Sequence, residues 1–234
     1  MIQQKKTELI LALDCDNKKL AIELLKEFKG ELKWVKIGLQ MFISEGLGFL
    51  DIVNSLGYNI FLDLKLHDIP NTVSKAIQSL AKAPIKMLTI HASGGYEMCK
   101  YSVDARNEHN PDLKLLAVTI LTSMNERMLH LIGINNSIDE QVIKLSKSSL
   151  EQGIDGLVAS PLEISILRKQ FGYDPLIVTP GIRLDGNNKN EQKRILNPKE
   201  ASELGASYIV IGRPILNSSN PLDTIKSINK LICN

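Results

Sequence analysis

Short apolar runs rich in Ile, Leu and Val recur along the whole chain. Each run ends in a polar or glycine-containing turn and is followed by a segment with helical spacing. Continuous rather than alternating apolar sequence is typical of parallel strands that are covered on both faces. The pattern predicts strands at Leu9–Leu13, Trp34–Ile37, Ile60–Leu64, Met87–Ile90, Leu115–Thr119, Gly156–Val158, Leu176–Val178 and Tyr208–Ile211.

The segments between these runs place apolar residues on one face of a helix. Val73, Ile77 and Leu80 share such a face, and Pro70 stands near the helix start, where its missing N–H costs nothing. The same spacing is found before the second strand and at the end of the chain, so strands and helices alternate in about eight βα units.

About eight βα units in 234 residues predict an α/β fold of the (β/α)8 TIM barrel type. No Pro/Ser-rich linker or change in composition divides the chain, so we expect one domain over residues 1–234. The alternative is a doubly wound open sheet, which usually carries a GxGxxG turn after its first strand. The first run here ends in Leu13-Asp14-Cys15-Asp16, without a glycine, which favours the barrel.

Composition excludes several classes of partner. The 28 Lys and Arg against 26 Asp and Glu are too balanced for a general nucleic-acid binder. No apolar stretch approaches the ~20 residues of a membrane span, and Met1–Lys6 lacks the apolar core of a secretory signal. The three cysteines form no CxxC motif. We therefore expect a cytoplasmic protein that binds neither nucleic acid nor membrane.

Charged residues gather where the first three strands end, which is the functional end of such a barrel. Alternation along the third strand puts Asp63 and Lys65 on one face, roughly 6.5 Å apart along the strand. Lys36 and Asp14 end the neighbouring strands, and Asp68 lies just beyond. Each of these charged side chains would have a neighbour of opposite charge. An ion-pair network that only sets strand register is the structural alternative, but charges clustered at this end favour catalysis.

Glycine and arginine end the last two strands. Gly181 and Arg183 follow the seventh, and Gly212 and Arg213 follow the eighth. Loops after these two strands are the recurrent phosphate site of such barrels, where glycine admits the anion and arginine binds it through two hydrogen bonds. The alternative is that the glycines only shape the turns and the arginines only lie on the surface.

Two polar segments follow other strands. The long stretch 184–194 is a candidate lid over a ligand, or else a surface excursion. Thr122 and Ser123 follow the fifth strand and could hydrogen-bond a polar ring, although Thr-Ser is also a normal helix start.

The acidic residues also raise the question of a metal. Asp14, Asp63 and Asp68 could hold Mg²⁺. Lys36 and Lys65 stand among them and would supply the positive charge instead, so we expect no metal and no cofactor.

The segment Asp63–Val73, DLKLHDIPNTV, resembles the signature of the orotidine 5′-phosphate decarboxylase family. The resemblance extends through LALD, VKIG, LTSM, TPGIR, QKR and IGRP over nearly the whole chain. The DxKxxD core is shared with Mg²⁺-dependent sugar-phosphate relatives, whereas the following Ile-Pro-Asn-Thr is more specific. Those relatives tend to carry an acidic residue near the end of the second strand, where this chain has Lys36.

The resemblance implies decarboxylation of orotidine 5′-monophosphate to UMP and CO₂ in pyrimidine biosynthesis. It implies no cofactor and a homodimer with its sites at the interface. Lys65 would then donate the proton to C6 of the pyrimidine, Asp63 would lie beside the departing carboxylate, and Lys36 would touch both Asp63 and the ribose. Loss of CO₂ leaves a carbanion in the ring plane, which an ammonium held by Asp63 and Asp68 would stabilise electrostatically.

The remaining residues carried over by the resemblance bind substrate. Asp14 would bind a ribose hydroxyl, and Asp68 and Thr72 would reach into the partner subunit's site. Thr122 and Ser123 would lie near the ribose and the pyrimidine edge. The phosphate would be held by Gln192, Gly212 and Arg213, with Arg183 beside them.

Three other functions remain open at this point. One is a Schiff-base aldolase with Lys65 as nucleophile. Another is a Mg²⁺-dependent sugar-phosphate lyase or decarboxylase of the same barrel superfamily. The third is a phosphate-binding protein without catalysis, which the intact set of charges argues against.

Overall fold

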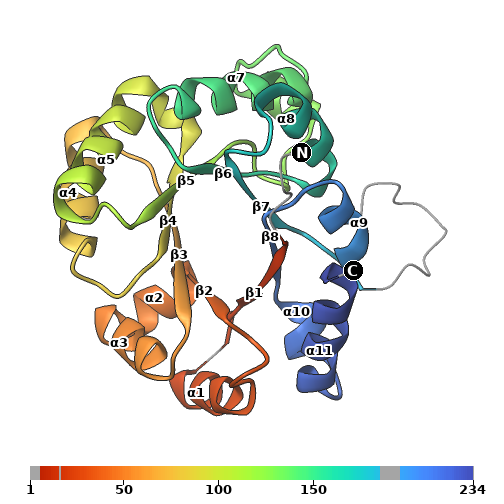
Figure 1. Cartoon of the computed structure of the whole chain (residues 1–234). Coiled ribbons are helices and arrows are strands. Elements are labelled where there is room, and N and C mark those ends of the chain that lie inside the picture. The colour runs from red at the N-terminus through yellow and green to blue at the C-terminus, as the bar shows by residue number, and fades with distance from the viewer. Residues whose placement is uncertain (1–5, 16, 185–195, 234) are drawn as a thin grey trace.

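A computed structural model describes residues 6–15, 17–184 and 196–233 of the chain. Parallel strands close into a barrel in sequence order, with β8 hydrogen-bonded to β1 (Figure 1). The predicted barrel is therefore confirmed, and the predicted strand ends differ from the observed ones by at most two residues. The strands are β1 (Glu8–Ala12), β2 (Trp34–Gly38), β3 (Asn59–Leu66), β4 (Met87–His91), β5 (Lys114–Val118), β6 (Gly156–Val158), β7 (Leu176–Pro180) and β8 (Tyr208–Ile211).

Helices surround the barrel and connect successive strands (Figure 1). They are α1 (Lys18–Glu27), α2 (Leu39–Glu45), α3 (Leu47–Ser55), α4 (Pro70–Leu80), α5 (Gly95–His109), α6 (Glu126–Leu131), α7 (Ile138–Leu150), α8 (Ile164–Phe171), α9 (Pro198–Glu203), α10 (Arg213–Leu216) and α11 (Pro221–Ile232). Two 3₁₀ turns, η1 (Ala92–Gly94) and η2 (Pro161–Glu163), precede α5 and α8. Within the described part of the chain, none of the helices has the length and apolar character needed to cross a membrane.

Local sequence explains where several of these helices begin. Pro70 occupies the first turn of α4, as predicted. Ser137 and Glu140 form a reciprocal capping box at the start of α7, and Asn197 and Glu200 form one at the start of α9. Because these caps satisfy backbone N–H groups that no helical carbonyl can reach, they fix the residue at which each helix begins.

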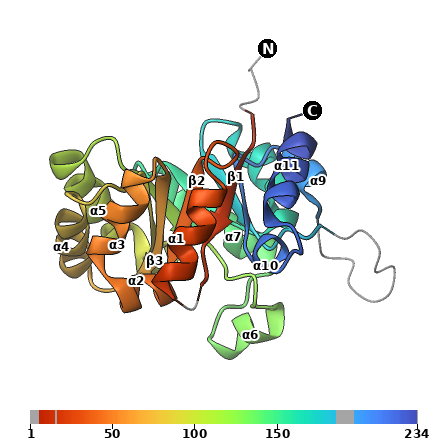
Figure 2. The same cartoon turned by 90° about the horizontal axis from the view of Figure 1, so that it is seen from below.

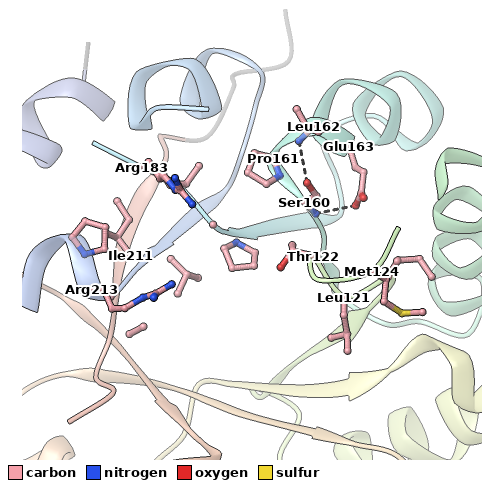
Figure 3. A pocket seen from close by; sticks show the side chains of 18 of the residues that line it. Leu121, Thr122, Met124, Ser160, Pro161, Leu162, Glu163, Arg183, Ile211 and Arg213 are labelled. Carbon is pink, nitrogen blue, oxygen red and sulfur yellow. Dashed lines mark hydrogen bonds between the residues drawn. The ribbon is translucent and has the colours of Figure 1, made fainter. Parts of the chain in front are cut away.

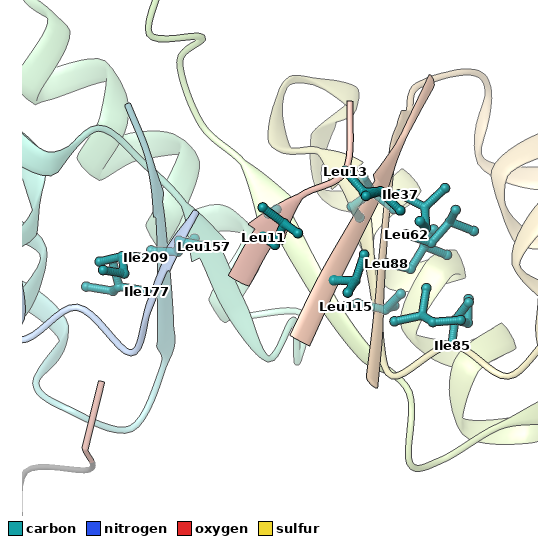
Figure 4. Packing of buried hydrophobic residues seen from close by; sticks show 14 of the residues in the cluster. Leu11, Leu13, Ile37, Leu62, Ile85, Leu88, Leu115, Leu157, Ile177 and Ile209 are labelled. Atoms are coloured by element: carbon teal, nitrogen blue, oxygen red, sulfur yellow. The ribbon is translucent and has the colours of Figure 1, made fainter. Parts of the chain in front are cut away.

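The apolar residues form two separate cores. The outer core lies between the strands and the helices and includes Leu11, Ile37 and Leu62 (Figure 4). The inner core fills the barrel itself, with side chains from successive strands such as Ile10 and Phe61, so the interior is packed and is not a pore. At roughly 1.5–3 kcal/mol for each large apolar side chain buried, these two layers dominate the stability of the fold.

Aromatic side chains close the amino-terminal end of the barrel. Trp34 packs edge to face against Tyr208, with 5.3 Å between ring centroids, and its indole N–H donates to Glu8 at 3.1 Å. The opposite end, where the strands finish, holds polar side chains. In Figure 2 helix α6 projects beyond the barrel at that end, away from the amino terminus.

Candidate active site

Inward-facing positions change from apolar to polar as the first four strands approach the carboxyl end of the barrel. Residues two apart on a strand share a face. Ala12 is therefore followed by Asp14, Trp34 by Lys36, Phe61 by Asp63, and Met87 by Thr89, while the first member of each pair belongs to the inner core. The period of the strands thus carries the charged residues into the barrel mouth. The inner core ends where these polar groups begin.

The four charged residues predicted to meet at this mouth form one continuous chain of ion pairs. Lys36 Nζ lies 3.3 Å from Asp14 Oδ1 and 3.7 Å from Asp63 Oδ2. Lys65 Nζ lies 2.8 and 2.9 Å from the two oxygens of Asp63. Only 12% of the Lys36 and Asp63 side chains is exposed, so each buried charge depends on its opposite neighbour.

Strand β3 does not follow the regular pleat that the sequence predicts. Leu62 pairs with Leu88 and Leu66 pairs with Ile90, so β3 has two more residues in this interval than β4. Lys65 adopts a φ of +52°, the left-handed region, and is alone in this among the described non-glycine residues. The predicted meeting of Asp63 and Lys65 is correct, but a bulge rather than simple alternation brings them together.

Asp68 lies apart from the charged cluster within the single chain. Its carboxylate accepts a hydrogen bond from the Ile69 N–H at 2.7 Å, and both Asp68 and Thr72 are exposed at the start of α4. Among the described residues, Asp63 is the carboxylate in ion-pair contact with Lys65. The part of Asp68 in holding Lys65, which the resemblance assigns across a subunit interface, stays a prediction.

A cavity of about 1000 Å³ opens beside the cluster at the same end of the barrel. Arg183 and Arg213 lie on one side of it, and Thr122 lies on the other (Figure 3). Asp14 and Lys36 also line it, so the cavity connects the charged cluster with the two arginines. This is the arrangement expected for a ligand with an anionic group at one end.

Glycine avoids a tight contact where the end of β8 approaches β1. A Cβ on Gly212 would lie 3.1 Å from Ala12 Cβ and 3.3 Å from Ala12 O. The close approach leaves the Gly212 backbone lining the cavity beside Arg213. Gly181 has a φ of +83°, a conformation that glycine adopts without strain, and so allows the sharp turn before Arg183.

Several predicted site residues are not placed in the cavity. Asp63, Lys65 and Thr72 do not line it, although Lys36, which does, lies 3.7 Å from Asp63. Ser123 is exposed and does not line it. Gln192 and nearly all of the predicted lid belong to residues 185–195, which lie outside the described residues.

The structure adds residues that the sequence reasoning missed. Ser160 and Glu163 line the cavity and form a capping box at η2, in which the Ser160 N–H donates to Glu163 at 2.8 Å (Figure 3). Burial raises the pKa of Glu163 to about 7. The polar pair two and five residues after the short strand β6 was a usable signal, because Ser-Pro-x-Glu has the form of a helix start.

Strand β4 supplies two further polar residues beside Lys65. The Thr89 hydroxyl lies 3.0 Å from Asp63, and the His91 ring lies 5.3 Å from that of His67. Burial lowers the pKa of His91, and the neighbouring His67 and Lys65 lower it further. Polar residues at alternate positions of an otherwise apolar strand were the signal that could have revealed them.

The donor set around the acidic residues suits an ammonium. Lys36 Nζ occupies the position between Asp14 and Asp63. In the part of the chain that the structure describes, no group of three or more His, Cys, Asp or Glu side chains is arranged to hold a metal ion.

Comparison with known proteins agrees with this geometry. The family model "Orotidine 5'-phosphate decarboxylase / HUMPS family" matches residues 7–228. An orotidine 5′-phosphate decarboxylase of Opitutus terrae is 45% identical over 221 residues, covering 94% of this chain and 96% of the relative. That of Wigglesworthia glossinidia brevipalpis is 46% identical over 224 residues, covering 96% of this chain and 97% of the relative.

Solved structures show the same relationship. The crystal structure of orotidine 5′-phosphate decarboxylase from Lactobacillus acidophilus superposes with a TM-score of 0.86 at 36% identity, covering 98% of this chain and 100% of that one. An uncharacterized conserved protein from Geobacillus kaustophilus gives a TM-score of 0.85 at 32% identity, with 96% and 99% covered. By family model, sequence identity and fold together, the chain belongs to the orotidine 5′-phosphate decarboxylase / HUMPS family.

Proposed function

We propose that the protein is an orotidine 5′-phosphate decarboxylase, a carboxy-lyase that converts orotidine 5′-monophosphate to UMP and CO₂. The observation that carries the proposal is the Lys65 ammonium, fixed within 2.9 Å of both Asp63 oxygens at the mouth of the barrel. The names and high identity of the relatives support the same activity.

The cavity has room for the substrate with its two ends at separate groups of residues. The phosphate binds beside Arg183, Arg213 and the Gly212 backbone, and Gln192 is proposed to join them. Asp14 and Lys36 bind the ribose hydroxyls, and Thr122 lies toward the ribose and the pyrimidine edge. Ser123, which is exposed outside the cavity lining, is proposed to join Thr122 there. This orientation brings C6 of the pyrimidine toward Lys65 and its carboxylate toward Asp63.

Lys65 is the proposed acid of the reaction. The bond between C6 and the carboxylate carbon breaks, CO₂ departs, and the electron pair stays on C6 in the ring plane. A fixed ammonium beside that carbon stabilises the developing negative charge. Lys65 then transfers a proton from Nζ to C6, which gives UMP, and the neutral amine regains a proton from solvent.

Asp63 and Lys36 hold this acid in place. Asp63 binds Lys65 through both oxygens, and Lys36 binds Asp63 from the other side. Orientation of reacting groups lowers the barrier because little freedom is left to lose at the transition state. No cofactor is needed in this scheme, since the protein itself supplies the stabilising charge.

The proposed enzyme is a homodimer in which Asp68 and Thr72 complete the partner subunit's site. Their exposure at the start of α4 leaves them free to reach another chain. Large apolar side chains are also exposed on α2, just before α4 and on α5, namely Ile43, Ile69 and Tyr96. Such side chains at one end of a barrel are suited to an interface. The enzyme would act in the cytoplasm, in UMP synthesis.

The proposal is tested by the loss of orotidylate absorbance with purified protein in the presence of EDTA. We expect turnover with EDTA present, and we expect Lys65→Ala to abolish turnover while leaving UMP binding largely intact. Lys114→Ala is the matched control, because Lys114 also pairs with an aspartate, Asp155 at 3.0 Å, but at the start of β5.

Other outcomes would support other functions. Activity that EDTA removes, with turnover of a sugar phosphate, would indicate the Mg²⁺-dependent lyase. Trapping of a substrate–lysine adduct by borohydride would indicate the aldolase. Substantial decarboxylation by Lys65→Ala would remove Lys65 from the mechanism.

A further inference from the structure

Thr89 is the single β4 residue that faces the bulge of β3. The register runs from Leu62↔Leu88 to Leu66↔Ile90, so residues 63–65 of β3 stand opposite Thr89 alone. A bulge of this kind leaves backbone groups without their regular ladder partners. The two residues that the bulge displaces, Asp63 and Lys65, are those to which the proposed chemistry is assigned.

The Thr89 hydroxyl contacts both of these residues. It accepts a hydrogen bond from the Lys65 backbone N–H at 2.9 Å and donates one to Asp63 Oδ1 at 3.0 Å. The side chain is fully buried. Because an ionised carboxylate has no proton to give, the hydroxyl proton points to Asp63 and the oxygen lone pair remains for the Lys65 amide. The hydroxyl thus has one orientation and both of its partners are satisfied.

The backbone at Lys65 needs such a restraint. Its φ of +52° is unfavourable for a residue with a Cβ, and strained conformations persist only where the surroundings hold them. Without the hydroxyl, the partly buried Lys65 amide would lose this partner, and the strand would gain by returning toward a regular pleat. That change would move Lys65 Nζ away from its position 2.8 Å from Asp63.

We propose that Thr89 is a positioning residue, whose hydroxyl locks the left-handed backbone of Lys65 and the carboxylate of Asp63 into one rigid unit. The kinetic test of this role depends on the proposed decarboxylation being correct. The structural test depends only on the geometry around Lys65 and Asp63. Thr89 acts through Lys65 and Asp63 and does not itself touch the substrate.

The kinetic test compares Thr89→Val, which keeps the shape but removes the hydroxyl, with Thr89→Ser, which keeps the hydroxyl. We expect Thr89→Val to lower kcat roughly 100-fold, the loss that a displacement of about 1 Å produces. KM and UMP affinity should change little, because the cavity and its arginines are untouched. Thr89→Ser should recover most of kcat.

Thr7→Val is the matched control. Thr7 is also buried and its hydroxyl also makes a buried hydrogen bond, to Ala206 O at 2.7 Å, but it lies before β1 at the opposite end of the barrel. We expect this variant to lose some thermal stability and to keep its kcat. If Thr7→Val lowered kcat as much as Thr89→Val does, the loss of any buried hydroxyl would explain the effect. That result would overturn the proposal.

Crystal structures separate this inference from the proposed function. In Thr89→Val we expect Lys65 to leave the left-handed region and its Nζ to move away from Asp63, whereas Thr89→Ser keeps both. Unchanged geometry in Thr89→Val overturns the positioning role, whatever the substrate. Wild-type protein that fails to decarboxylate orotidylate would instead overturn the proposed function. If Thr89→Val does not fold, an inactive but folded Thr89→Ser also overturns the inference.

Discussion

Individual side chains at the barrel mouth are stable there only in combination. An isolated buried charge costs several kcal/mol, and removal of one partner of a buried pair typically costs about 3–5 kcal/mol. Lys36 is mostly buried and contacts both Asp14 and Asp63, so it compensates two carboxylates at once. The same fixed charges that solve this burial problem are the ones proposed to stabilise negative charge during the reaction.

Arg213 provides a test at the scale of one residue. We expect Arg213→Ala to lower kcat/KM for orotidylate about 10²–10³-fold, because charge-assisted hydrogen bonds contribute about 1.5–3 kcal/mol each and 1.4 kcal/mol corresponds to a factor of ten. Steady-state kinetics with orotidine, which lacks the phosphate, is the control. With orotidine as the substrate, Arg213→Ala should have little effect on kcat/KM. An equal loss with both substrates would contradict phosphate binding by Arg213.

Among the elements, the turn after β6 combines a structural cap with a buried acid. Glu163 accepts the Ser160 N–H and is 5% exposed. Burial is the main reason that its pKa rises from 4.5 to about 7, and the charge of Asp139 adds to it, while the hydrogen bond from Ser160 opposes it. The folded protein therefore holds the Glu163 proton more tightly than the unfolded chain does.

The pH dependence of stability follows from that difference. Between pH 4.5 and pH 7 the unfolded chain releases the proton while the folded protein keeps it, so the free energy of unfolding falls as pH rises through this window and levels off above it. The free energy of unfolding falls by about 3 kcal/mol in total, because each unit of difference in pKa corresponds to about 1.36 kcal/mol. We expect Glu163→Gln to gain stability relative to wild type by up to about this amount as pH rises from 4.5 to 7. Urea unfolding at several pH values measures it, and a constant difference would contradict the role of Glu163.

For the whole molecule, the arrangement of exposed apolar residues leads to a prediction about assembly. Ile69 is 66% exposed between Asp68 and α4, next to the residues proposed to enter the partner subunit's site. We expect wild-type protein to sediment as a dimer in analytical ultracentrifugation. Ile69→Glu should give monomers with low activity, because a buried charge would oppose the interface.

Leu231→Glu is the control for this prediction. Leu231 is also an exposed apolar residue but lies on α11, on a different part of the ring of helices (Figure 1). We expect it to leave both sedimentation and activity unchanged. A fully active wild-type monomer would contradict the proposed interface and the roles assigned to Asp68 and Thr72.

The sequence by itself determined the order and type of the elements. Continuous apolar runs marked the strands because both faces of each strand are covered, and this property is local to each run. The same strand pattern also brought four charged residues together, since the ends of consecutive parallel strands meet at one end of a closed barrel. These residues are Asp14, Lys36, Asp63 and Lys65. The two arginines at the cavity followed in the same way from the ends of the last strands.

Tertiary structure alone decided how these residues are held. The bulge of β3, the left-handed Lys65 and the bond from Thr89 to Asp63 depend on the register between β3 and β4, which are joined through a helix. The raised pKa of Glu163 likewise depends on what covers it. Register and burial are set by contacts between segments distant in sequence, so no local pattern of residues encodes them, whereas periodicity encodes the elements themselves.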